Sequence, residues 1–324
     1  METNNKFRFW PFGHKQNEIT EDEDRTPTLK FFFKLLFRRA GGLVTLNFMM
    51  LFLLIPIIAG VFIYISAPTT PTTVTPLYAP IYGVSLITDS PAIDVALTTV
   101  NLQIGLPVLS VTRSVVLILL GLLLALTWGL QNVGAAYVLR GFFRGDPVFV
   151  FSDYFYGIKK NWKQAIGIGV LDISVIAILI IDYVGLYQRT GFYWNDVMYF
   201  MIFAIGILYF FMRFYIYQLM ITFDMKWTKI FKNSLIFTML GFKRNFLAAV
   251  GILLMVGVNA LLILLLLPYL TIPMVLPAFY LLSFSAFMSV YAAYPIIDRY
   301  LIKPYEESHP RETEPEEETP EIDS

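Results

Sequence analysis

Long apolar runs alternate with short polar stretches along this chain of 324 residues. Several runs exceed the roughly 18 consecutive apolar residues that are typical of a membrane-spanning helix. The pattern predicts six spans, at 41–65, 114–139, 164–184, 197–220, 246–267 and 274–296. The first ~29 residues are polar, so we expect no cleavable signal peptide, and the first span should act as an uncleaved anchor. We therefore predict an all-α polytopic membrane helix bundle, with the six transmembrane helices arranged as three hairpins.

Basic residues with helical spacing precede three of these spans. Lys30, Lys34 and Arg38 recur every four residues among phenylalanine and leucine. In 151–162 and 223–235, aromatic and aliphatic residues recur at intervals of three or four, as on one face of a helix. Helices of this kind lie in the headgroup layer of membranes that contain anionic lipids. We predict that a cytoplasmic interfacial amphipathic helix precedes each hairpin, and that the anionic headgroups of the bilayer are a partner.

The distribution of lysine and arginine predicts the orientation. The segments before span 1, between spans 2 and 3 and between spans 4 and 5 are basic, whereas 66–112 has neither lysine nor arginine. Short basic loops remain in the cytoplasm, so both termini are expected there. The predicted domains are an N-terminal arm at 1–29, a membrane domain at 30–303 with an extracellular insertion at 66–112, and a C-terminal tail at 304–324. The acidic composition of that tail predicts disorder.

The composition argues against most enzymatic chemistry. Apolar residues make up 57% of the chain and charged residues 15%, and there is no cysteine. The two histidines, His14 and His309, both lie in the predicted tails. A thiolate nucleophile, a Cys/His zinc site and a Ser-His-Asp arrangement within the bundle are therefore excluded. We expect no catalytic residue, no metal site, no cofactor and no nucleic-acid partner.

One motif of a dozen residues occurs twice, as GIKKNWKQAIGI at 157–168 and GFKRNFLAAVGI at 241–252. We interpret each copy as the junction where an interfacial helix becomes a span. The asparagine can satisfy backbone groups freed at a bend, and alanine and glycine let neighbouring helices approach closely. The alternative is that any cytoplasmic entrance to a span collects basic and aromatic residues. The motif residues of interest are Lys159, Lys160, Asn161, Trp162, Lys243, Arg244, Asn245 and Phe246.

Polar residues inside the predicted spans are the candidate ligand site, because polar groups are costly in a membrane interior. Asp172 lies about 12 Å into span 3 from its cytoplasmic end, and Arg213 lies at nearly the same depth in span 4. We predict an ion pair between these two residues. Asn47, Gln131 and Asn132 fall within a turn of the same level, which predicts one polar layer that faces the bundle interior. The layer could bind a substrate or partner, or it could only hold helices together.

Two stretches resemble a known family. They are FFFKLLFRRAGGLVTLNFMMLFLLIPI near the N-terminus and NVGAAYVLRGFFRGDPVFVFSDYFYGIKKNWKQA, in which a span ending in Tyr-x-x-Arg precedes a Pro- and Phe-rich turn. Both are similar to the YesL-like family of bacterial integral membrane proteins. The resemblance covers most of 30–300, and the insertion 66–112 departs from it. It implies a multi-pass protein in the plasma membrane of a Gram-positive bacterium, in the genetic neighbourhood of carbohydrate importers of the ATP-binding cassette (ABC) type.

Three hypotheses follow from these observations. The first is an auxiliary or partner protein of carbohydrate uptake that binds ABC importer components. The second is a small-molecule transporter whose site is the layer around Asp172 and Arg213. The third is a membrane scaffold or sensor with no transported ligand. Association with itself as a homo-oligomer is a further possibility for any of the three.

Overall fold

The computed structural model describes residues 26–52, 54–71, 78–88, 90–93, 95–97, 105–187, 193–266 and 275–308. The predicted arm before residue 26 and the acidic residues after 308 lie outside this description. The chain divides into two compact units. Unit 1 comprises Met1–Leu51 with Gly129–Ser324, and unit 2 comprises Phe52–Trp128.

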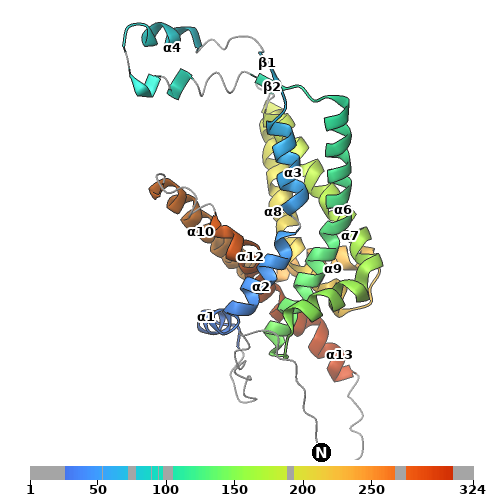
Figure 1. Cartoon of the computed structure of the whole chain (residues 1–324). Coiled ribbons are helices and arrows are strands. Elements are labelled where there is room, and N and C mark those ends of the chain that lie inside the picture. The colour runs from blue at the N-terminus through green and yellow to red at the C-terminus, as the bar shows by residue number, and fades with distance from the viewer. Residues whose placement is uncertain are drawn as a thin grey trace, which may run out of the picture. The chain divides into compact units, whose positions relative to one another are not determined.

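Unit 1 is helical throughout its described part (Figure 1). Its elements are α1 (Leu29–Arg38), α2 (Ala40–Leu51), the second half of α6 (Val111–Arg144), α7 (Val150–Tyr187), α8 (Tyr193–Thr222), α9 (Trp227–Leu240), α10 (Phe242–Leu265), α12 (Pro277–Ile297), the π-helix η2 (Asp298–Ile302) and α13 (Lys303–Ser308). Helix α7 packs on α8, and α10 packs on α12, as two of the predicted hairpins require.

Unit 2 contains the predicted insertion together with residues on both sides of it. Its elements are α3 (Leu54–Ile65), β1 (Thr69–Pro71), α4 (Tyr78–Ser85), β2 (Gly105–Pro107) and the first half of α6. The two short strands pair antiparallel, with Thr69 opposite Pro107. Gly60 of α3 lies opposite the Leu117 side chain of α6, which is the contact expected within the first hairpin.

The predicted all-α polytopic membrane bundle is confirmed. Within the described residues, five helices are long and apolar enough to cross a membrane: α6, α7, α8, α10 and the continuous run from α12 through α13. A sixth span results if α2 and α3 are taken together as one broken span. The predicted first span therefore contains a break, which lies just before Pro56. The proline has no N–H and crowds the carbonyl of Phe52 four residues earlier, so an uninterrupted helix is disfavoured there.

Helix α12 lies at the centre of unit 1. Its span has the largest buried share of the five, and it contacts α2, α8 and α10. One apolar cluster gathers around α8, with buried Tyr215 and Ile216 packed against residues of α7, α9 and α12. A second cluster joins α1, α2 and the end of α6 to α12, through side chains such as Leu35, Leu46 and Phe287. The two clusters meet across α12.

Two sequence predictions about helix ends are wrong. The expected interfacial helix at 151–162 is not a separate element, because α7 runs without interruption from Val150 to Tyr187. No proline interrupts that segment, and Asp153 caps its start by accepting a hydrogen bond from the N–H of Phe149 at 2.8 Å. The second concerns the tail: residues 304–308, expected to be disordered, are helical in α13. They extend the helix that began in α12.

Candidate functional site

Asp172 is the centre of a buried polar cluster between α7 and α8. Its side chain is fully buried, and the Nε of Arg213 lies 3.0 Å from one carboxylate oxygen and 3.2 Å from the other. Tyr209 donates its hydroxyl to Oδ1 at 2.8 Å, and Tyr217 donates to Oδ2 at 2.6 Å. The predicted ion pair is confirmed, and we call these four residues the Asp172 clamp.

The spacing along α8 explains how the clamp is built. Tyr209, Arg213 and Tyr217 follow one another at intervals of four residues, so their side chains lie along one face of the helix. That face meets α7. Each oxygen of the carboxylate accepts from one tyrosine, and Oδ2 also accepts from the arginine, whose Nε forms an ion-pair contact with Oδ1. The sequence interpretation missed the two tyrosines. The available signal was their placement one turn before and one turn after Arg213.

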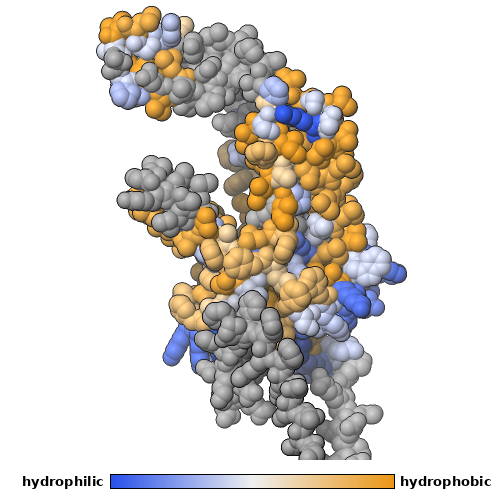
Figure 2. Space-filling view, viewed as in Figure 1, coloured by the Kyte–Doolittle hydropathy of each residue, from blue (hydrophilic) through white to orange (hydrophobic). Residues whose placement is uncertain are grey.

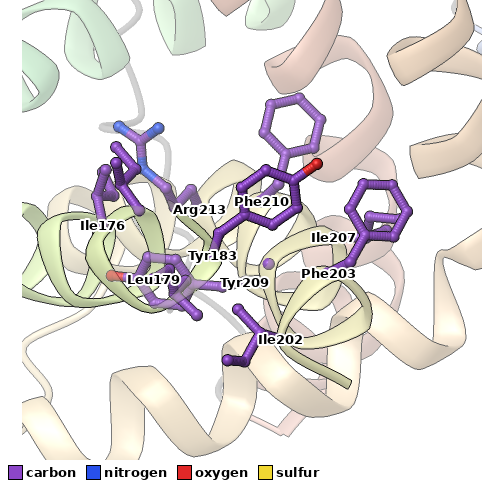
Figure 3. Close-up of a pocket in the computed structure, with 11 residues that line it drawn as sticks. Ile176, Leu179, Tyr183, Ile202, Phe203, Ile207, Tyr209, Phe210 and Arg213 are labelled. Carbon is purple, nitrogen blue, oxygen red and sulfur yellow. The ribbon is translucent and has the colours of Figure 1, made fainter. Parts of the chain in front are cut away.

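An apolar groove adjoins the clamp on the α7–α8 pair, with a volume of about 420 Å³. Figure 3 shows branched and aromatic side chains from both helices around it, and Arg213 at one edge. Ile180 and Phe203 in its wall are more than half exposed. Tyr209 and Arg213 supply polar groups to the groove wall, and both already bind Asp172. The groove therefore offers a ligand mainly hydrocarbon surface.

Asn47 is fully buried but belongs to a different contact. Its Nδ2 donates to the carbonyl of Ala278 at 2.5 Å, and its Oδ1 accepts from the N–H groups of Leu282 and Ser283, each at 2.9 Å. The amide thus bridges a donor and an acceptor of the α12 backbone that lie four residues apart. Equal depth led to the prediction that Asn47 shares a layer with Asp172, whereas its contacts tie α2 to α12. Depth does not fix the direction in which a helical residue faces.

Replacing Asn47 with leucine should destabilise the bundle by about 2 kcal/mol. The substitution removes cross-helix hydrogen bonds, each of which contributes about 0.6–2 kcal/mol in a membrane, while the polar backbone of α12 remains buried. Thermal unfolding in detergent measures the loss. Thr45→Val on the same helix is the matched control, because the Thr45 hydroxyl is exposed and bonds only its own helix, at the Gly41 carbonyl. Equal melting temperatures for the two variants would contradict the role assigned to Asn47.

Gln131 and Asn132 both lie half-buried on α6. They remain candidates for a polar contact within the bundle. Among the described residues, no group of three His, Cys, Asp or Glu side chains is placed to hold a metal ion.

The first copy of the repeated motif lies within the continuous helix α7. Lys159 and Lys160 are exposed, and Trp162 is half exposed. Asn161 donates to the Gly157 carbonyl one turn earlier at 3.0 Å. Its side-chain amide is therefore bonded within α7, which continues through this position as one helix. Gly167, near the end of the copy, is in close contact with the indole of Trp227, where a Cβ atom would overlap the ring.

The second copy starts at a true helix junction. Gly241 separates α9 from α10 and leaves room for the hydroxyl of Tyr215. That hydroxyl donates to Oδ1 of Asn245 at 2.8 Å, and Nδ2 of Asn245 donates to the Thr238 carbonyl at the end of α9 at 3.2 Å. The predicted role of the asparagine, satisfying backbone at a bend, is thus met in this copy. Lys243 and Phe246 are exposed beside it.

Arg244 of the second copy supports α12. It donates to the carbonyls of Tyr291 at 3.2 Å and Ala292 at 3.3 Å. Pro295 lies four residues after Tyr291 and has no N–H to offer that carbonyl. The guanidinium therefore supplies the donor that the proline cannot. Arg140 of α6 acts in the same way at the end of α8, where it donates to the Ile221 carbonyl at 2.9 Å.

A second, larger cavity lies where the helix ends of unit 1 meet, with a volume of about 1850 Å³. We call this side of unit 1 the terminal end, because residues 26–27 and the segment 294–306 both contribute to the wall. Charged side chains of both signs line it: Arg144, Asp146, Asp224, Arg244, Asp298, Arg299, Lys303 and Glu306. The π-helix η2 forms part of the wall, and such segments occur often at functional sites.

Comparison with family models, curated proteins and solved structures finds no match to this chain. The chain is a polytopic membrane protein whose spans carry a satisfied internal charge cluster and whose terminal end encloses a charged cavity.

Proposed function

We propose that this protein is an accessory membrane protein of carbohydrate uptake in a Gram-positive bacterium. It binds a component of an ABC importer at its terminal end, which faces the cytoplasm. The carbohydrate assignment depends on the resemblance to the YesL-like family. The mode of action, binding without transport, depends on the contrast between the Asp172 clamp and the cavity of the terminal end.

The saturation of Asp172 is the observation that carries this proposal. A transport site must exchange its protein contacts for contacts with a substrate, and it must be reachable. Asp172 has no exposed surface, and its two oxygens accept from Tyr209, Tyr217 and Arg213. Such an arrangement favours a structural tie between α7 and α8 over a site that a substrate visits.

The terminal end differs from the Asp172 clamp, because its charged side chains line a cavity and are partly exposed. Its cavity is wide, and its charged side chains include Arg144 and Asp146, which are each about half exposed. A polar rim with both signs of charge is typical of the surfaces that proteins use for non-obligate contacts. Its wall includes Arg144 and Arg244, from two of the basic segments that the distribution of lysine and arginine predicts to be cytoplasmic. An importer subunit that meets this end is therefore the favoured partner.

Site-directed cross-linking tests the proposal, because the chain has no cysteine of its own. Single cysteines at Arg299 and Glu306 carry a photoactivatable label in the cavity wall, and a cysteine at Val256 on the exposed face of α10 is the matched control. Cells are grown on a polysaccharide, and cross-linked products from their membranes are identified by mass spectrometry. We expect an importer subunit at the cavity positions and none at Val256. Absence of every importer subunit from the cavity positions would contradict the proposal.

A further inference from the structure

Six exposed lysines gather where α7 and α9 meet. We call them the lysine patch: Lys159, Lys160 and Lys163 on α7, and Lys226, Lys229 and Lys232 on α9. Lys163 and Lys226 line one cavity of about 720 Å³, so the two groups of three adjoin. Figure 2 shows hydrophilic side chains where Figure 1 draws the first half of α7. Two helices that are far apart in the sequence thus present one basic surface.

Packing between α7 and α9 fixes the lysine patch in place. Nε2 of Gln164 donates to the Met225 carbonyl at 2.7 Å. The Trp227 indole packs against Gly167 so closely that a Cβ atom there would overlap the ring. Ile230, one turn further along α9, is fully buried in the cluster around α8. The two groups of lysines are therefore held next to each other by packed helices.

The charge of the patch is not balanced by the described part of the chain. None of the six lysines forms an ion pair with a carboxylate of the described residues. Lys160 lies over the Tyr156 ring at 6.0 Å and Lys163 over the Trp162 ring at 5.5 Å, but these contacts do not neutralise an ammonium group. Asp224 in the cavity wall is a single negative charge against six positive ones. The patch therefore favours an occupant with several carboxylates.

The described chain ends close to this patch. Tyr305 and Glu306 of α13 line the cavity of the terminal end together with Asp224 and Met225. Asp224 and Met225 also line the cavity that contains Lys163 and Lys226, so the two cavities adjoin. Sixteen residues, 309–324, follow the end of α13. Fully extended, they can span about 55 Å, which is enough to reach and cover the patch.

We propose that the C-terminal segment 309–324 docks on the lysine patch of its own chain. The segment has seven acidic residues and one arginine, so its negative charge nearly matches the six lysines. A segment of this composition buries too little apolar surface to fold alone, and it adapts to the surface that it meets. Its attachment to α13 gives it a millimolar effective concentration, an advantage over untethered anions. The docked segment covers the lysines and competes with anionic headgroups and acidic partners for them.

Zero-length cross-linking of the purified full chain in detergent tests the docking. A carbodiimide joins a carboxylate to an amine only where the two groups are in contact, and mass spectrometry identifies the joined peptides. We expect the glutamates of 312–321 to be joined to the lysine patch several times more often than to Lys30 of α1, which is also exposed. Raising the salt from 0.1 M to 1 M shortens the Debye length from about 10 Å to about 3 Å and should remove most of these products. Equal joining to Lys30 would overturn the proposal.

A fluorescent label on the segment measures how often it is docked. The chain has no cysteine, so Thr319→Cys gives one labelling site without a change of charge. Lys226→Gln with Lys229→Gln and Lys232→Gln should lower the ratio of docked to free segment about threefold or more, because each exposed ion pair contributes a factor of about 1.4 to 5. The fluorescence anisotropy of the label should fall toward its value in 1 M salt. The same three lysines changed to arginine are the matched control and should retain the anisotropy; an unchanged anisotropy in the glutamine variant would refute the docking.

Two further arms distinguish other occupants of the patch. In a mixture of unlabelled and ¹⁵N-labelled protein, the two peptides of each cross-linked product should have the same isotope; equally frequent mixed products would assign the patch to a second copy and overturn the proposal. In bilayers that contain phosphatidylglycerol, the products should persist, and their loss there would identify anionic headgroups as the occupant. The test needs no importer component, so its outcome is independent of the proposed function.

Discussion

Replacing Asp172 with leucine should lower the stability of the bundle by about 3–5 kcal/mol. The substitution removes one partner of a buried charge pair and leaves Arg213, Tyr209 and Tyr217 without their common acceptor. Breaking a buried pair in this way is strongly destabilising because the remaining charge is uncompensated. Thermal unfolding in detergent, read by fluorescence-detected size exclusion, measures the change.

The pair itself is tested by a double variant. Arg213→Leu combined with Asp172→Leu removes both charges, and we expect it to recover much of the stability lost in the single variant, since buried pairs are often replaceable by apolar residues. Asp182→Asn is the control on the same helix, because Asp182 is exposed. If the single variant were as stable as the control, the clamp would not be the tie between α7 and α8 that we describe.

Gly129→Ala should be the most damaging of the small substitutions. A Cβ atom at Gly129 would lie 1.8 Å from the carbonyl oxygen of Ala165 and 2.8 Å from the Cα of Gly169. Both obstacles are backbone atoms of α7, which cannot turn aside as a flexible side chain can. We expect the two helices to be forced apart, at a cost of about 3 kcal/mol, the upper part of the usual range for overpacking.

The same helix offers a matched control for this change. Gly121→Ala adds the same methyl group to α6 where no atom lies within 4 Å. Because alanine is also the better helix former, the control should be neutral or slightly stabilising. Yield of monodisperse protein and melting temperature should therefore separate the two variants. A tolerated alanine at Gly129 would show that the close crossing of α6 and α7 is not needed.

The sequence predicted the spans and one buried pair, because both depend on local patterns. Apolar runs define spans directly, and Asp172 and Arg213 lie at similar depth on antiparallel neighbours joined by a short loop. The direction in which a span faces another is set by packing, so the sequence could not assign Asn47 to α12. The continuity of α7 was not predictable either, since an amphipathic segment can be a separate helix or the first turns of a span.

The supports of α12 illustrate the same limit over longer distances. Pro295 indicates that the Tyr291 carbonyl, four residues earlier, lacks its usual backbone donor. The sequence does not indicate that the missing donor is Arg244, which lies 47 residues before Tyr291. The two copies of the repeated motif also adopt different structures: the first lies within the continuous helix α7, and the second forms the junction between α9 and α10. Identical residue types were satisfied by different neighbours, with the Asn161 amide bonded inside its own helix and the Asn245 amide bonded across the break.

The bond between Asn47 and α12 has a consequence for biosynthesis. It joins α2, in the first candidate span of the described residues, to α12, in the last of them, across 231 residues. A ribosome delivers these segments in order, so α2 must wait in the bilayer until every other helix has been inserted. The contact between α2 and α12 thus forms only after α12 has been inserted. A chain released before α12 is made would keep the Asn47 amide buried without its partners on α12.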